Sequence, residues 1–205
     1  MSLGGFKRLP WEIGDKSGEG TTLNNISQIF KARGDYESAL TYLHQALNIR
    51  LEIGDKSGEG NTLNNISKIF AARGDYKSAL TYLHQSLDIR QKIGDKSGEG
   101  TTLNDIATIA HTHGDFGTAL RYLKQALDIA LEIGDAAGTC LTTINIGHSQ
   151  WQSNQNDEAH KSWAHAYQIA KKIGHAQALK TLTSIAEQLK LPNGVESWKT
   201  IGKSK

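Results

Sequence analysis

Apolar residues recur along the chain with the spacing of amphipathic helices. Between Gly18 and Arg33 they fall on one face of a helix with about 3.6 residues per turn. The apolar residues of this face are Leu23, Ile26, Ile29 and Phe30. Residues 36–53 carry a wider apolar arc, as expected for a helix that contacts neighbours on two sides. Gly34 is typical of a helix end and Asp35 of a helix start, so the pattern predicts a helix hairpin.

This helix pair belongs to a unit of 40 residues that recurs along the chain. The letters IGDKSGEG begin at Ile13, Ile53 and Ile93, a looser copy begins at Ile133, and a remnant begins at Ile173. Only eight of the 40 positions differ between the first two copies. A fixed period of this size is typical of a stacked repeat array. We predict four units, over residues 15–54, 55–94, 95–134 and 135–174.

The segments that flank the four units have other patterns. Residues 1–14 match the end of a unit and are interpreted as a truncated repeat remnant. Residues 175–190 form one more amphipathic helix with a polar outer side, which is interpreted as a C-terminal capping helix. Pro192 interrupts that helix, and residues 191–205 are predicted to be a flexible tail, with Trp198 as the residue that could dock.

Composition excludes several classes of protein. The 205 residues carry a formal net charge of +2, whereas a nucleic-acid binder needs a strongly basic stripe. The single cysteine, Cys140, cannot form a disulfide within the chain and fits a reducing cytoplasm. The N-terminal stretch has no long apolar run, so we expect neither a signal peptide nor a membrane span. We therefore predict a cytoplasmic protein that binds neither nucleic acid nor membrane.

The pattern of the unit resembles the tetratricopeptide repeat (TPR). The residues that carry the resemblance are Leu23, Ile26, Ser27, Phe30, Gly34, Asp35, Tyr36, Ala39, Leu43 and Ala46. The standard repeat has about 34 residues, and the longer unit is similar to the repeats of Pins-type adaptors and kinesin light chains. The resemblance covers residues 13–174. It implies an all-α, right-handed α-solenoid of helix-turn-helix repeats that holds a partner peptide in its concave groove.

The resemblance also implies that the first helix of each unit lines that groove. We expect the following residues, one turn from the apolar stripe, to bind the peptide: Asn24, Asn25, Gln28, Lys31, Asn64, Asn65, Lys68, Asn104, Asp105, His111, Asn145, His148 and Trp151. An asparagine amide offers two donors and an acceptor, which suits a bound main chain. In the resembling families the asparagines that match Asn25, Asn65 and Asn145 contact peptide backbone, whereas Asp105 lacks the donors. In the alternative interpretation, these asparagines bond neighbouring repeats or copy an ancestral unit.

The charged and aromatic candidates also have two interpretations. Lys31, Lys68 and His111 add positive charge that favours an acidic peptide, or they are solvated surface residues. Trp151 is an aromatic anchor for the peptide, or it packs in the core of a drifted repeat.

Several motifs for phosphate binding, metal binding and catalysis are suggested by composition, but their residues do not have the required spacing. In GDKSGEG, Glu19 stands where a phosphate-binding loop needs lysine. A calcium loop counted from Asp15 needs glutamate at its twelfth position, where Ile26 stands. The histidines are not spaced to share a metal ion, and no serine, histidine and carboxylate cluster along the chain. We therefore predict no catalytic residue, no metal site and no cofactor.

The sequence predicts a non-enzymatic module for protein–protein interaction, with two alternatives. The first helix of the first unit is poorly covered by the N-terminal segment, which favours a self-associating scaffold with a homo-oligomer formed through the open N-terminal end. The truncated start of the chain favours a sensor or adaptor portion of a larger signalling or protease-fused protein.

Overall fold

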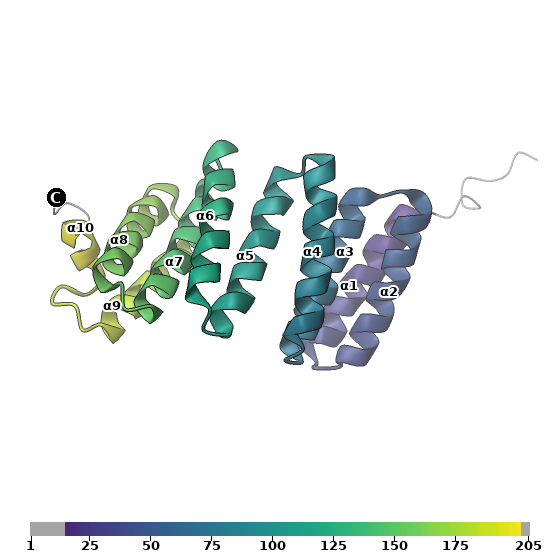
Figure 1. The fold of residues 1–205 in the computed structure, drawn as a ribbon, viewed down its shortest axis with the longest axis horizontal. Helices are drawn as coiled ribbons and strands as arrows, with labels where there is room; N and C mark the ends of the chain where they lie inside the picture. Colours follow the sequence, from purple (N-terminus) through teal and green to yellow (C-terminus); the bar gives the residue numbers. More distant parts are fainter. Residues whose placement is uncertain (1–14, 202–205) are drawn as a thin grey trace, which may run out of the picture.

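The computed structural model describes residues 15–201, which form nine longer α-helices, a 3-10 turn and a short final helix (Figure 1). The predicted repeat remnant, residues 1–14, lies outside the described residues, as do residues 202–205. The helices are α1 (Lys16–Ala32), α2 (Tyr36–Ile53), α3 (Lys56–Ala72), α4 (Tyr76–Ile93), α5 (Lys96–Thr112), α6 (Phe116–Glu132), α7 (Ala136–Gln152), α8 (Asn156–Ile173), α9 (Ala176–Gln188), η2 (Gly194–Glu196) and α10 (Ser197–Ile201).

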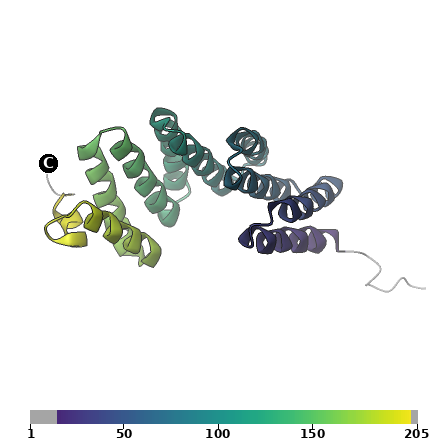
Figure 2. The same ribbon diagram turned by 90° about the horizontal axis from the view of Figure 1, so that it is seen from below.

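The helices pack as consecutive pairs that stack side by side along the molecule. The most extensive contacts join α1 with α2, α3 with α4, α5 with α6 and α7 with α8. Figures 1 and 2 show these pairs following one another in chain order, without returning to an earlier pair. The all-α solenoid predicted from the sequence is therefore confirmed. Helices α3, α5, α7 and α9 also contact one another in succession, so the odd-numbered helices form one layer of the array.

A glycine–aspartate pair marks most boundaries between helices. Gly34 has a φ of 78°, a left-handed conformation that glycine adopts without steric cost. The side chain of Asp35 then accepts a hydrogen bond from the backbone N–H of Ser38 at 3.0 Å, which satisfies one of the free donors of the first turn. The same N-cap bond begins each helix from α1 to α7, with the caps Asp15, Asp35, Asp55, Asp75, Asp95, Asp115 and Asp135.

The boundary between α7 and α8 lacks both signals. Asn154 takes the place of the glycine and keeps the left-handed conformation, with a φ of 61°. Gln155 takes the place of the aspartate, and its side chain makes no cap hydrogen bond. The fourth unit therefore keeps the shape of the hairpin without its two strongest local determinants.

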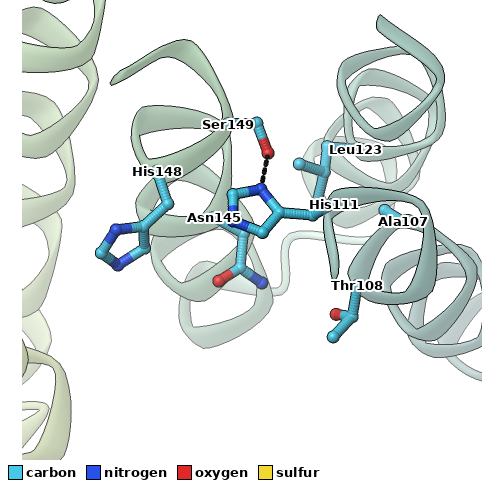
Figure 3. A pocket seen from close by; sticks show the side chains of 7 residues that line it. All are labelled: Ala107, Thr108, His111, Leu123, Asn145, His148 and Ser149. Atoms are coloured by element: carbon cyan, nitrogen blue, oxygen red, sulfur yellow. Dashed lines mark hydrogen bonds between the residues drawn. The ribbon is translucent and has the colours of Figure 1, made fainter. Parts of the chain in front are cut away.

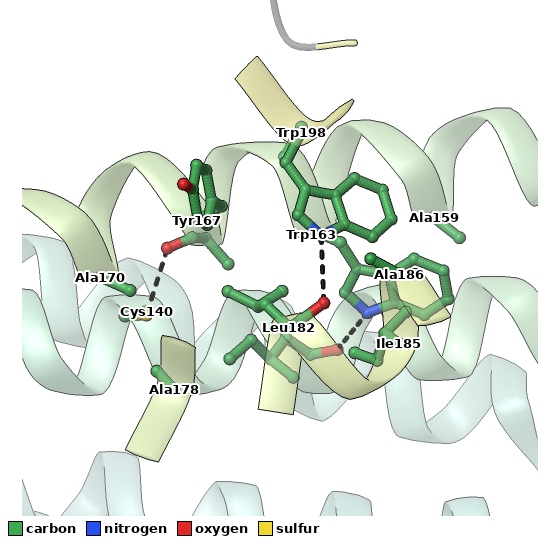
Figure 4. Packing of buried hydrophobic residues seen from close by; sticks show 13 residues of the cluster. Cys140, Ala159, Trp163, Tyr167, Ala170, Ala178, Leu182, Ile185, Ala186 and Trp198 are labelled. Carbon is green, nitrogen blue, oxygen red and sulfur yellow. Dashed lines mark hydrogen bonds between the residues drawn. The ribbon is translucent and has the colours of Figure 1, made fainter. Parts of the chain in front are cut away.

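The C-terminal segment differs from the prediction of a flexible tail. The side chain of Trp198 is fully buried, and its indole N–H donates to the carbonyl oxygen of Leu182 in α9 at 3.1 Å. Its ring lies 6.0 Å from that of Trp163, between centroids, within the apolar cluster of α7, α8 and α9 (Figure 4). The prediction of flexibility is wrong for the described residues from 191 onward, because burial of one large indole holds α10 against α8.

Candidate functional site

The residues predicted to bind peptide lie on α1, α3, α5 and α7, within the layer of odd-numbered helices. Asn25 is exposed on α1, and most of the other candidates are half-buried. Asn64 is the exception, with only 4% of its surface exposed. The surface that these helices share therefore holds the candidates together, although their amides are not equally accessible.

The repeated asparagines bond one another between units. The Asn65 amide donates to the Asn24 side-chain oxygen at 2.9 Å, across α3 and α1. One unit later, the Asn64 amide donates to the Asp105 carboxylate at 2.7 Å, across α3 and α5. Lys68 also lies 3.4 Å from that carboxylate. Asp105, which was expected to lose a peptide contact, accepts bonds from the preceding unit instead.

The same arrangement continues from α5 to α7 with a different acceptor. The Asn104 amide donates to the Thr142 hydroxyl at 3.0 Å and to the backbone oxygen of Gly100 at 3.1 Å. We call these inter-unit bonds the amide ladder, formed by Asn24, Asn65, Asn64, Asp105, Asn104 and Thr142. Within the described part of the chain, no hydrogen bond engages the side chains of Asn25 or Asn145. The ladder agrees with the interpretation that asparagines bond neighbouring repeats, and it leaves these two amides available to a ligand.

A polar hollow of about 700 Å³ lies over α1, α3 and α5 beside the ladder. Its lining includes Asn65 and Lys68, together with two arginines that are not among the predicted residues, Arg50 and Arg90. Each arginine forms an ion pair with the aspartate cap of the following helix, Arg90 with Asp95 at 2.5 Å. The hollow therefore combines amide, ammonium and carboxylate groups on one surface.

The two arginines are buried, with 8% and 5% of the surface of Arg50 and Arg90 exposed. Arg90 is fully bonded: its Nε donates to the Ser86 hydroxyl at 3.1 Å and its second terminal nitrogen to the Asn61 side-chain oxygen at 2.8 Å. The sequence held a signal for this pair, because an arginine recurs at one position in the last turn of α2 and α4, within an apolar arc. The equivalent residues of α6 and α8 are alanines.

A second hollow, of about 230 Å³, brings together three of the predicted residues, which are His111, Asn145 and His148 (Figure 3). It lies between α5 and α7, and we call it the α5–α7 pocket. A ring nitrogen of His111 lies 3.0 Å from the Ser149 hydroxyl. Burial and the nearby His111 lower the pKa of His148 from its ordinary value of 6.5, so the neutral imidazole is favoured in the folded protein.

Trp151 lies at the edge of the C-terminal apolar cluster. Its ring centroid is 5.6 Å from that of His160 and 5.8 Å from that of Trp163, both on α8. The indole remains partly exposed, so one side of it packs in the core while the other faces solvent.

Residues 15–201 contain neither a metal-binding cluster nor a helix suited to cross a membrane. No three histidine, cysteine or acidic side chains there are grouped so that they could hold a metal ion. None of the described helices combines the length and the apolar character that crossing a bilayer requires.

Comparisons with known proteins agree with the repeat pattern. The family model described as Tetratricopeptide repeat matches residues 18–92, 58–132 and 98–172. The search of curated proteins finds no match.

Several solved structures share the fold. Aspartyl phosphate phosphatase F from Bacillus subtilis has a TM-score of 0.76 at 14% identity, over 91% of this chain and 54% of that protein. A Rap protein complexed with Competence and Sporulation Factor has a TM-score of 0.72 at 18% identity, over 90% of this chain and 53% of that protein. A Podosopora anserina kinesin light chain with nearly identical TPR-like repeats has a TM-score of 0.70 at 14% identity, over 94% of this chain and all of that one. At these identities the likeness establishes the fold alone, and this chain spans about half of the first two proteins.

Proposed function

Because the chain belongs to the tetratricopeptide repeat family, we propose that it is a non-enzymatic module that binds a partner peptide along its odd-numbered helices. The observations that carry this proposal are a polar hollow over α1, α3 and α5, a second hollow between α5 and α7, and two amides on these helices, Asn25 on α1 and Asn145 in the second hollow, that make no hydrogen bond to another described residue. An unpaired amide on a preformed surface can bond the N–H and C=O groups of an extended chain. Because this surface is already formed, the repeat protein loses little conformational entropy when the peptide binds.

Two further features support a peptide as the ligand. The complex of the Rap protein with Competence and Sporulation Factor joins a protein of this fold with a separate factor. The residues that line the hollow over α1, α3 and α5 come from three successive units, which suits a segment that crosses several repeats. Lys68 is engaged by Asp105, which weakens the case for an acidic peptide at that point of the groove.

An affinity pull-down from native lysate, read by mass spectrometry, tests the proposal. The test variant is Asn25→Ala with Asn145→Ala, since neither amide bonds another described residue and the fold should not depend on them. The matched control is Gln45→Ala with Gln85→Ala, which removes two exposed amides from the even-numbered helices α2 and α4. We expect prey that the wild type and the control retain and the test variant loses. Prey that all three retain would place binding elsewhere.

A second candidate function is self-association through the N-terminal end. Ile29 on α1 is 53% exposed, whereas the equivalent residues Ile69 and Ile109 are 0% and 5% exposed against a preceding unit. A repeat face of this kind, which none of the described helices covers, can stack on a second copy of the chain. Light scattering across a range of concentrations tests this, with Ile29→Lys as the variant that should prevent association. A strict monomer at every concentration would contradict it.

The setting of the module is also a proposal. Cys140 is a buried free thiol, which suits the reducing conditions of the cytoplasm. The chain spans about half of the phosphatase and of the Rap protein, which is consistent with a sensor or adaptor portion of a larger signalling protein.

A further inference from the structure

The α5–α7 pocket exists because the fourth unit departs from the others at a buried position. Ser149 occupies the place of Ile69 and Ile109, which are 0% and 5% exposed and fill the equivalent space two units and one unit earlier. Replacing a branched apolar side chain with a hydroxymethyl group leaves room that the His111 ring, 3.0 Å from the Ser149 hydroxyl, takes up only in part. Ser149 is itself 1% exposed, so it forms an inner wall of the pocket.

The mouth of the pocket is open for a related reason. Between α3 and α5 the equivalent surface is crossed by the ion pair of Lys68 and Asp105, two long or charged side chains that meet at 3.4 Å. Between α5 and α7 the same two positions carry Thr108 and Asn145. The hydroxyl of Thr108 turns back to the backbone oxygen of Asn104 at 2.9 Å, so nothing bridges the two helices there. The substitution in the interior, at Ser149, and those at the surface, at Thr108 and Asn145, therefore occur at the same junction of the array.

The lining of the pocket is uncharged and apolar at its base. Leu123 and Ala107, which are 2% and 1% exposed, form the base. His111 is engaged with Ser149 on one side, and Figure 3 shows its ring between the two helices. No carboxylate, ammonium or guanidinium group is among the seven lining residues. A charged side chain would leave water here without gaining an opposite charge, which is costly, whereas an apolar side chain gains from the same burial.

We propose that the α5–α7 pocket holds one bulky uncharged side chain, aromatic or aliphatic, of an extended peptide, while the Asn145 amide at its rim bonds the adjacent peptide main chain. This inference rests on the proposed peptide-binding function and adds the residue class that the site selects. A volume of about 230 Å³ has room for one such side chain. The pocket thereby gives a sequence preference to a surface whose main-chain contacts alone carry none.

The test uses single-residue probes and needs no partner protein. N-acetyl-tryptophanamide and N-acetyl-leucinamide are titrated into the isotope-labelled chain, with N-acetyl-aspartate amide as the charged probe, and binding is followed by NMR. For the two uncharged probes we expect shifts at Asn145, His111 and Leu123. Ser149→Ile, which restores the residue of Ile69 and Ile109, should remove these shifts or weaken binding at least tenfold. Ser149→Ala, which keeps the pocket open, should retain them.

A further variant guards against a disturbed fold. His111→Ala with Ser149→Ile reproduces the Ala71 and Ile109 pair of the preceding junction and should fold as that junction does. Equal probe binding by the wild type and either filled variant would overturn the inference, and so would tighter binding of the aspartate probe than of the tryptophan probe. The titration uses pure probes and no lysate, so its outcome does not depend on whether the pull-down finds a partner. A negative pull-down and a negative titration can therefore be told apart.

Discussion

The indole of Trp163 occupies the space that a Cβ atom of residue 147 would need. An ideal Cβ built on Gly147 would lie 2.6 Å from Cδ1 of that ring, well inside the distance that real side chains keep. The three earlier units carry leucine at the tryptophan position and serine or alanine at the glycine position. The fourth unit has therefore enlarged one partner and reduced the other, so the two changes compensate across α7 and α8.

The contact between Gly147 and Trp163 predicts that a glycine-to-alanine substitution will have the opposite of its usual effect in a helix. Gly→Ala within a helix usually stabilises by up to about 1 kcal/mol. Gly147→Ala should instead destabilise by roughly 1–3 kcal/mol, because Trp163 is 2% exposed and is held by a 3.2 Å hydrogen bond to the carbonyl oxygen of Ile144. Chemical denaturation measures the change in the free energy of unfolding.

The control for this prediction is a double-mutant cycle. Trp163→Leu restores the leucine of the other units and should remove the penalty for alanine at residue 147, even though the substitution has its own cost in lost packing. A penalty of the same size in both backgrounds would show that the indole is not its cause.

The two buried arginines predict a pair of opposite stability changes. Arg50 Nε is buried without a hydrogen-bond partner, whereas Arg90 Nε donates to the Ser86 hydroxyl; residue 46, the equivalent of Ser86, is alanine. Ala46→Ser should supply the missing acceptor and stabilise the protein by about 1 kcal/mol, and Ser86→Ala should destabilise it by about 1–2 kcal/mol. Thermal and urea denaturation of both variants check the signs. A loss of stability in Ala46→Ser would mean that the hydroxyl is not tolerated beside Gly20.

The boundary between α7 and α8 predicts a stabilising substitution. Gln155→Asp should restore the N-cap bond that begins the second helix of the other hairpins and raise the free energy of unfolding by about 0.5–2 kcal/mol. Asp115→Gln is the matched control, since it removes the bond to Thr118 at the equivalent boundary and should lower stability. Calorimetry of the two variants compares them with the wild type, and an unchanged melting temperature for Gln155→Asp would contradict the expectation.

The environment of His148 predicts a dependence of stability on pH. Its pKa is lowered in the folded state by burial and by His111, so below about pH 6.5 the unfolded chain binds the proton more readily than the folded one. The stabilisation is complete above pH 6.5 and is lost as the pH falls from there through the folded pKa. The titratable groups that share a hollow with this imidazole are His111 on α5, which opposes its protonation, and Lys180 on α9, which is exposed to solvent.

Urea denaturation near pH 7.5 and near pH 5.5 measures this dependence. The wild type should lose more stability on acidification than His148→Gln, which carries the residue found at position 28 of the first unit. An equal loss in the two proteins would assign the dependence to other groups.

Much of the fold could be predicted because its determinants are local and repeated. Glycine–aspartate pairs and the apolar stripes act within one hairpin, and any copy of the unit reveals them. The partners of Asn24, Asn64 and Asn104 could not be predicted, because they depend on how far each helix is displaced along its neighbour. Trp198 was identified as a residue that could dock, but the order of its segment could not be predicted, because a single indole holds it and no periodic pattern marks the contact.

The candidate site also has one part that could be predicted from the sequence and one part that could not. The sequence indicated the helices that carry Asn25, Asn145 and His148, because the resemblance places the first helix of each unit on one surface. It did not indicate the α5–α7 pocket, which is formed by what Ser149 lacks compared with Ile109. A smaller side chain leaves a cavity only if no neighbour fills the space, and the positions of the neighbours are known only from the structure.

The pairing of each buried arginine with the next aspartate makes the junctions of the array interchangeable. Arg50 meets Asp55 as Arg90 meets Asp95, and the eight letters around each aspartate are the same. Deletion of residues 55–94 would bring Asp95 to Arg50 and Asp105 to Asn24, each a contact of a kind the array already makes. Deleting or duplicating whole 40-residue units in the N-terminal half would therefore shorten or lengthen the array without altering its junctions. The different junctions of the C-terminal half would be unaffected.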